Sequence, residues 1–227
     1  MKVLKLTAMV AIAMATLTLS SCGGGVGSSD SKFFGKVPGI YSEMTGKKEA
    51  MQEKFKTCES QDEAMKLMAD AVKAEKEYES KLEEAGKALD GKTIEIESTP
   101  EITVNSPITL TFDGFWSKSG LEPKFKMEGD VVAAQNYQSE DSKMLSTGDP
   151  SRYVGMAQQV FLVGYDDAGT RVFSQKVAYF PMDLISESAL GVKAGTPLKF
   201  ETFQITEKNV EGCLKATSLK LSYESEK

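Results

Sequence analysis

Histidine is absent from this chain of 227 residues, and its absence limits the chemistry that the side chains can perform. Imidazole is the commonest general base and the commonest metal ligand in proteins. The sequence therefore excludes Ser-His-Asp and Cys-His catalysis, together with every zinc site that uses His. The side chains that could still act in catalysis or metal binding are the carboxylates, Lys, Tyr and three Cys.

The carboxylates show no spacing that is typical of a catalytic or metal site. Adjacent acids occur at Glu140-Asp141 and Asp166-Asp167, with Asp149 nearby in sequence. Calcium favours several loop carboxylates, but the Asp-x-Asp-x-Asp-Gly pattern is missing. Glu122 and Asp130 could be read as a glycosidase pair, yet nothing in their spacing selects them over other acids. We therefore predict no enzyme, no metal and no cofactor.

The first 22 residues have the features of a secretory signal. Lys2 and Lys5 precede an uncharged apolar run from Leu6 to Leu19. That run is shorter than the roughly 20 apolar residues that a spanning helix needs. A basic start, a short apolar core and a small-residue end are typical of a cleaved signal peptide.

The end of this segment, Leu19-Ser20-Ser21-Cys22, resembles the lipobox of bacterial lipoproteins. The resemblance implies that residues 1–21 are removed and that the Cys22 thiol carries diacylglycerol, often with a further acyl chain on the new amine. Two or three acyl chains anchor a protein stably, so the lipid bilayer is an expected partner. Gly23 stands where an Asp would retain a Gram-negative lipoprotein in the inner membrane, so the resemblance implies the outer membrane. It leaves open which side the protein faces.

Two further cysteines, Cys58 and Cys213, remain after lipidation of Cys22. Outside the cytoplasm they could form a disulfide, which would tie the predicted helices to the last predicted strand. Such a bridge requires Cα atoms within about 4.4–6.8 Å of each other. The alternative is two separate buried thiols, and the sequence leaves both readings open.

Three aromatic residues are the candidates for ligand binding. Trp116 follows a predicted strand, whereas Tyr137 and Tyr153 border the polar stretch 138–156. Aromatic faces beside polar groups can bind sugars. The alternative interpretation is that these side chains pack into a core.

The charge of the chain argues against nucleic acid as a partner. The formal net charge is −6, and removing Lys2 and Lys5 with the signal lowers it by two, to −8. Neutralising phosphates requires clustered Lys or Arg, and the sequence contains no basic block.

A tether and two helices are predicted between the lipobox and residue 90. Gly23 to Ser31 is rich in Gly and Ser, so we expect residues 22–41 to form a flexible tether. The apolar residues at its end, Phe33, Phe34, Val37 and Ile40, are expected to dock on the folded part. The first predicted helix runs from Ser42 to Cys58. The second begins at a capping box, in which Ser60 is the N-cap and Glu63 follows three residues later, and it stops near Gly91. Its apolar series recurs at intervals of four and three, and consists of Leu67, Ala71, Ala74, Tyr78, Leu82, Ala85 and Leu89. The short connection predicts an antiparallel helical hairpin over 42–90, which either binds a partner as an arm or packs on the rest of the chain.

Beyond residue 91 the apolar residues alternate at period two, which predicts strands. The expected strands are 92–98, 101–105, 107–113, 123–128, 130–137, 157–165, 170–179, 197–205 and 214–223, with one helical turn at 186–190. Asp166 to Gly169 is typical of a β-hairpin turn. The alternating runs, Gly129 and the segment 193–200 resemble the Ig-like β-sandwich domains of bacterial envelope lipoproteins.

The predicted fold is therefore α+β, with an N-terminal antiparallel helical hairpin followed by an antiparallel Ig-like β-sandwich over 91–227. The predicted function is that of a membrane-anchored envelope lipoprotein whose hairpin and sandwich bind a partner protein or an envelope polymer. The alternative is a lipoprotein that binds a small ligand or glycan through its loop aromatics and acids.

Overall fold

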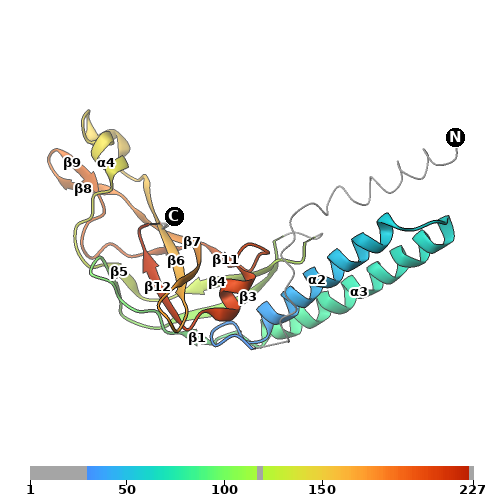
Figure 1. Ribbon diagram of the computed structural model, residues 1–227. Helices are drawn as coiled ribbons and strands as arrows, with labels where there is room; N and C mark the ends of the chain where they lie inside the picture. The colour runs from blue at the N-terminus through green and yellow to red at the C-terminus, as the bar shows by residue number, and fades with distance from the viewer. Residues whose placement is uncertain (1–29, 117–119, 225–227) are drawn as a thin grey trace.

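The computed structural model of this protein describes residues 30–116 and 120–224. The predicted signal peptide, Cys22 and most of the predicted tether lie outside these residues. The described part is a mixed α+β fold with antiparallel sheets, as predicted (Figure 1). Within it, no helix combines the length and the apolar composition needed to cross a bilayer.

Among the described residues, two long helices precede the sheets, and two short helices and one 3-10 turn lie between strands. Their bounds are α2 Val37–Lys56, α3 Gln61–Lys87, α4 Glu140–Leu145, η1 Pro150–Tyr153 and α5 Val210–Lys215. The strands of the first half are β1 Thr93–Ile94, β2 Ile102–Val104, β3 Ile108–Phe115, β4 Pro123–Glu128 and β5 Val131–Ala133. The later strands are β6 Ala157–Tyr165, β7 Arg171–Pro181, β8 Asp183–Ser186, β9 Ala189–Gly191, β10 Lys199–Phe200, β11 Thr202–Gln204 and β12 Ser218–Ser222.

The strands form two four-stranded sheets and two smaller ladders. One large sheet has the order β1-β3-β4-β11 and the other has the order β10-β7-β6-β12, while β2 pairs with β5 and β8 with β9. All of these pairings are antiparallel. One hydrophobic core takes in buried side chains from both large sheets, among them Phe125, Leu162 and Phe203. The same core includes Tyr41 and Leu82 from the long helices.

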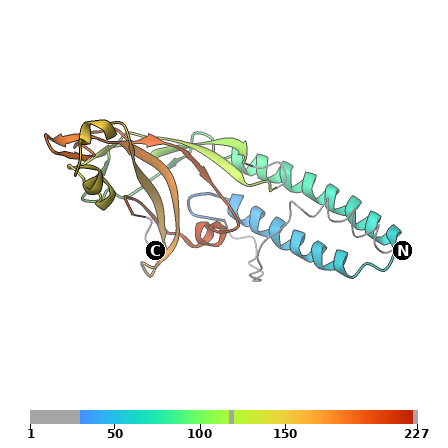
Figure 2. The ribbon, with the colours of Figure 1, turned by 90° about the horizontal axis from the view of Figure 1, so that it is seen from above.

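The long helices α2 and α3, here called the helix pair, lie side by side and extend away from the sheets (Figure 1, Figure 2). The predicted N-cap Ser60 is present at the start of α3, but the Glu63 side chain bonds to the residue before the cap rather than to Ser60 itself. The Ser60 hydroxyl accepts a hydrogen bond from the Glu63 amide at 3.2 Å, and the Glu63 carboxylate accepts one from the Glu59 amide at 3.3 Å. Tyr78 joins the two helices by donating a hydrogen bond to the Glu43 carboxylate at 2.7 Å.

Residues 30–41 of the predicted tether are part of the fold, and Phe34 and Val37 dock on the core there, as predicted. Phe34 is fully buried and stacks on Phe203 with ring centroids 4.8 Å apart. Ser31 donates a hydrogen bond to the Cys213 carbonyl at 2.8 Å. Pro38 then lies in the first turn of α2, where its missing N–H costs nothing, so the helix begins at Val37 rather than at Ser42.

Several predicted elements differ in the structure. The segment 186–190 is the β8–β9 hairpin and not a helical turn. The predicted strand 197–205 is two strands in different sheets, because β10 pairs with β7 and β11 with β4. The polar stretch 138–156 contains α4 and η1, and α5 ends before the last strand begins at Ser218.

Candidate interaction surface

The three candidate aromatic residues do not form one site. Trp116 is 63% exposed at the end of β3, where its amide bonds to the Glu122 carbonyl. Tyr137 pairs with Val192 after β9, and Tyr153 lies in η1, which contacts β8 and β9, and both pack against the core. The sequence could not show this separation, because the places of these residues depend on which strands pair and on how the sheets pack.

One face of the Tyr137 ring is in contact with another aromatic ring. Its ring stacks on that of Tyr223, with centroids 3.9 Å apart and planes inclined by 5°. Burial, followed by the charges of Glu224 and Glu101, raises the pKa of Tyr137. The Tyr223 hydroxyl is buried without a hydrogen-bond partner among the described residues, and burial raises its pKa most strongly. This pair therefore behaves as part of the core, with one ring face already covered.

The acidic candidates are separated as well. Glu122 precedes β4 and Asp130 follows it, so about 20 Å of extended strand lies between them. Glycosidase carboxylates are less than about 10 Å apart, which excludes this pair. Asp166 accepts hydrogen bonds from the amides of Ala168 and Thr170 in the β6–β7 turn. Among the described residues, no group of three or more Cys, Asp or Glu side chains could hold a metal ion.

One acidic cluster lies where α2 meets the sheets. Burial raises the pKa of Tyr41, and the charges of Glu122 and Glu207 raise it further. Burial also raises the pKa of Glu122, with Glu207 adding to the effect and Lys48 opposing it. The cluster therefore lies at the base of the helix pair, where Tyr41 is part of the core.

Cys58 and Cys213 are both free thiols, so the structure does not contain the disulfide that the sequence left open. Cys58 follows α2 at the turn of the helix pair, whereas Cys213 is buried in α5 beside the sheets. The helix pair is long, and its turn lies far from the sheets (Figure 1). This separation is why the two thiols cannot bond.

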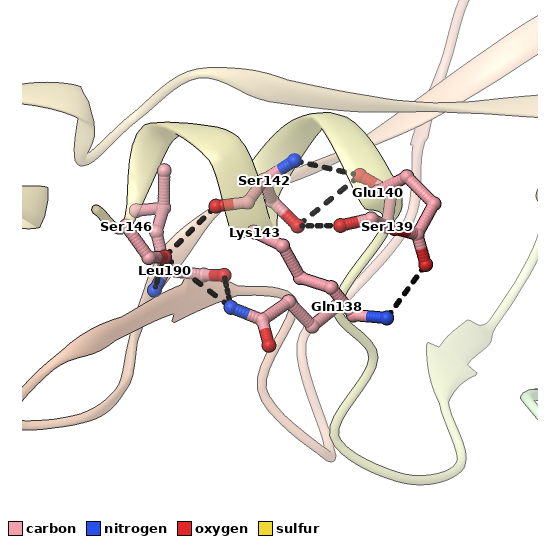
Figure 3. Close-up of polar contacts among 7 residues, drawn as sticks. All are labelled: Gln138, Ser139, Glu140, Ser142, Lys143, Ser146 and Leu190. Atoms are coloured by element: carbon pink, nitrogen blue, oxygen red, sulfur yellow. Dashed lines mark hydrogen bonds and ion pairs between the residues drawn. The ribbon is translucent and has the colours of Figure 1, made fainter.

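A polar network holds α4 against β9 (Figure 3). The Ser139 hydroxyl caps α4 by accepting a hydrogen bond from the Ser142 amide at 3.2 Å. Ser146 accepts hydrogen bonds from the Leu190 amide at 2.8 Å and from the Gln138 side chain at 3.2 Å. Gln138 also donates to the Leu190 carbonyl at 3.3 Å. The network fixes one face of α4 and leaves Met144 on the other, 73% exposed.

The helix pair carries a regularly spaced group of exposed apolar side chains. Met65, Met68 and Val72 on α3 are 61%, 43% and 54% exposed. Their spacing of three and four residues places them on one face of the helix. We call these three residues the α3 stripe. It spans about 10 Å along the helix axis.

The α3 stripe is distinct from the face by which α3 packs on α2. That packing face runs through the predicted apolar series, in which Tyr78 and Leu82 are buried, and it includes the buried Ala64, which the prediction did not contain. Leu67 and Ala71 belong to the same series and are half-buried. The sequence prediction used this series and missed the second one, although the spacing of Met65, Met68 and Val72 is visible in the sequence. Only the structure shows which of the two faces is covered.

Comparisons with known proteins give no independent assignment. No protein family, curated protein or solved structure matches this chain significantly.

Proposed function

We propose that this protein is a membrane-anchored envelope lipoprotein whose helix pair binds a partner protein or envelope polymer. The α3 stripe is the observation that carries the proposal. Exposed apolar side chains cost free energy in water, and a row of them on a projecting helix is the arrangement by which helices dock on partners. The anchor itself rests on the lipobox sequence, with lipid on Cys22 and the outer membrane as the expected location.

The position of the α3 stripe supports an interaction role. The base of the helix pair is held by large buried side chains, including Tyr41, Met44, Tyr78 and Leu82. In the half of α3 nearer the turn, from Ala64 to Glu77, Ala64 is the one buried residue. The stripe therefore lies on the part of α3 that extends beyond the sheets (Figure 2).

The finer features of the fold are part of the proposal. We infer that α2 and α3 are the predicted antiparallel hairpin, because Tyr78 of α3 bonds to Glu43 near the start of α2. We also infer that the two four-stranded sheets are the layers of a β-sandwich, because one core contains residues from both. An Ig-like strand order remains a prediction from the sequence.

The glycan-binding alternative has less support. Trp116 lies apart from the two tyrosines, and Tyr137 has one face covered by Tyr223. An interaction role through the α3 stripe requires no pocket, so it is the reading that the described residues favour.

Site-specific photo-crosslinking in intact cells tests the interaction role. A photo-reactive amino acid replacing Met68 should give a crosslinked adduct that is lost when Met65 and Val72 are both changed to Ser. The same amino acid at Met144, which is also exposed, is the matched control. Equal adducts from both positions, or none from position 68, would contradict the proposal.

The anchor has a separate test. Mass spectrometry of the mature N-terminus should find diacylglycerol on Cys22, and Cys22→Ser should release the protein from membranes. An unmodified Cys22 or a different cleavage position would contradict the lipoprotein assignment, whatever the helix pair binds.

A further inference from the structure

Two opposite charges bracket the α3 stripe on the same side of the helix. Asp62 precedes Met65 by three residues, and Lys76 follows Val72 by four. Asp62 and Lys76 are themselves 14 residues apart, which is close to four helical turns, so they lie along one edge of the stripe. Both side chains are exposed. The order along this edge is therefore negative, apolar, positive.

This order is nearly symmetric about Ala69. The midpoint between Asp62 and Lys76 is residue 69, and the midpoint of the stripe lies between Met68 and Ala69. A second α3 placed antiparallel on the first would bring Asp62 of each copy opposite Lys76 of the other. A parallel arrangement would instead bring like charges together. The small side chain of Ala69 at the centre allows the two helices to approach closely.

The charges of this region permit such a contact. Along α3 from Asp62 to Lys76, three Lys stand against four Asp and Glu, so this stretch carries only −1, whereas the whole chain carries −6. Within the described part of the chain, neither Asp62 nor Lys76 takes part in the ion pairs found on the helix pair, which are Lys47–Glu43, Lys56–Glu53 and Lys87–Glu83. Both charges are thus available to a partner, and the contact stretch carries little net charge to repel a copy of itself.

We propose that the partner of the α3 stripe is a second copy of this chain. Two α3 helices pair in antiparallel orientation, with Met65, Met68 and Val72 of each copy in contact with the same residues of the other. Asp62 and Lys76 form two reciprocal ion pairs at the ends of the contact. Such an interface is isologous, as expected for a two-fold dimer.

The size of the α3 stripe sets the strength of this pairing. Three side chains from each copy fall well short of the roughly 1,600 Å² that a standard stable interface buries. Pairing is therefore weak in dilute solution and depends on the high local concentration that a shared membrane anchor provides. In this respect the inference rests on the proposed function.

A zero-length crosslink is the direct test. The lipidated protein is placed in phosphatidylethanolamine–phosphatidylglycerol vesicles and treated with a carbodiimide, which joins a carboxylate to an amine in contact with it. Fourteen residues of helix separate Asp62 from Lys76 by about 21 Å within one copy, so an Asp62–Lys76 amide can form only between copies. Peptide mapping of the dimer band should find this amide. A dimer crosslinked elsewhere, or no dimer at high surface density, would overturn the proposal.

Charge reversal gives a second test that a folding defect cannot mimic. Donor and acceptor dyes on Cys58 report proximity between copies through energy transfer. Asp62→Lys alone and Lys76→Glu alone each place like charges opposite one another, so transfer should fall about tenfold. An equimolar mixture of the two variants restores both attractions, so transfer should return. Failure of the mixture to recover would overturn the proposed antiparallel pairing.

The controls separate this inference from the proposed function. Met68→Ser should abolish transfer, whereas Met144→Ser, at an exposed methionine of the opposite end, should leave it unchanged. If Cys22 carries lipid and no pairing occurs, the inference fails while the anchored-lipoprotein proposal stands. If Cys22 is unmodified, the proposed function fails, and sedimentation of the soluble chain at millimolar concentration still decides whether α3 pairs.

Discussion

Gly86 of α3 lies directly against the ring of Phe112 of β3, and the ring occupies the space that a side chain at position 86 would need. The Phe112 amide also donates a hydrogen bond to the Asp90 carboxylate at 2.6 Å. One residue of the sheet is thus held twice by the end of a helix. This contact is one of those that join the helix pair to the sheets.

Replacing Gly86 with Ala should therefore destabilise the protein. The added methyl group would overlap the Phe112 ring, and such overpacking typically costs about 1–3 kcal/mol. The higher helix propensity of Ala offsets about 1 kcal/mol of this cost.

Gly46 of α2 is the matched control, because nothing lies within 4 Å of a Cβ built there. Gly46→Ala should raise stability by about 0.5–1 kcal/mol. Urea denaturation measures both changes, and equal stability of the two variants would contradict the close contact.

Removing the Tyr78 hydroxyl should weaken the contact between α2 and α3. Tyr78→Phe loses the hydrogen bond to Glu43 and keeps the ring over which the Lys47 and Lys81 ammonium groups lie, both 5.1 Å from its centroid. Because the Glu43 side chain is half-exposed, the expected cost is about 0.5–1 kcal/mol at pH 7.

This cost should depend on pH. The Tyr78 phenol and then Lys47 bond to the Glu43 carboxylate and lower its pKa below the usual 4.5. A lowered carboxyl pKa contributes stability above the unfolded value, and that contribution disappears as the pH falls through the folded value. The difference in stability between Tyr78 and Tyr78→Phe proteins should therefore shrink below about pH 4.5. A difference that stays constant down to pH 3 would show that Glu43 is not its source.

Loss of the Ser60 hydroxyl should destabilise the start of α3. Ser60→Ala leaves the Glu63 amide without its acceptor, at a typical cost of about 1 kcal/mol. Ser80 lies on an exposed position within the same helix, so Ser80→Ala should be neutral or slightly stabilising. Thermal melts followed by circular dichroism compare the two variants. An unchanged melt for Ser60→Ala would mean that the cap does not contribute to stability.

Local patterns predicted the elements whose pairing partners are close in sequence. The strand Ala157–Tyr165 has the predicted bounds, and the turn that follows it is closed by Asp166, as its sequence indicated. Ser60 is the predicted helix cap for the same reason, since its partner Glu63 is only three residues away. In each case the physical determinants lie within one segment.

Elements that depend on distant partners could not be predicted in this way. The segment 186–190 has helix-forming residues, yet it is held as a β-hairpin by Ser146, which bonds to the Leu190 amide from 44 residues away. The exposure of Met65 has a similar origin. Met65 and Ala64 are neighbours in sequence, and only the position of α2 decides that Ala64 is buried and Met65 is not.

The two thiols should differ sharply in reactivity. Cys213 is fully buried in α5, and burial raises the pKa of its thiol. Cys58 is only half-buried at the turn of the helix pair, although burial and then the Glu63 charge raise its pKa as well. Of Cys58 and Cys213, a thiol reagent applied to the folded protein should therefore label Cys58 alone, and faster as the pH rises, because the thiolate is the nucleophile.

Unfolding the same protein without a reductant should expose the second thiol. Two labelled cysteines, Cys58 and Cys213, are then expected, because the structure leaves both free. Mapping the labelled peptides distinguishes them from any unlipidated Cys22. If neither residue reacted until a reductant was added, a disulfide would join them, and the helix pair would have to fold back onto α5. That geometry would bring the turn of the pair against the sheets and cover the α3 stripe, so this measurement bears on the interaction surface as well as on the thiols.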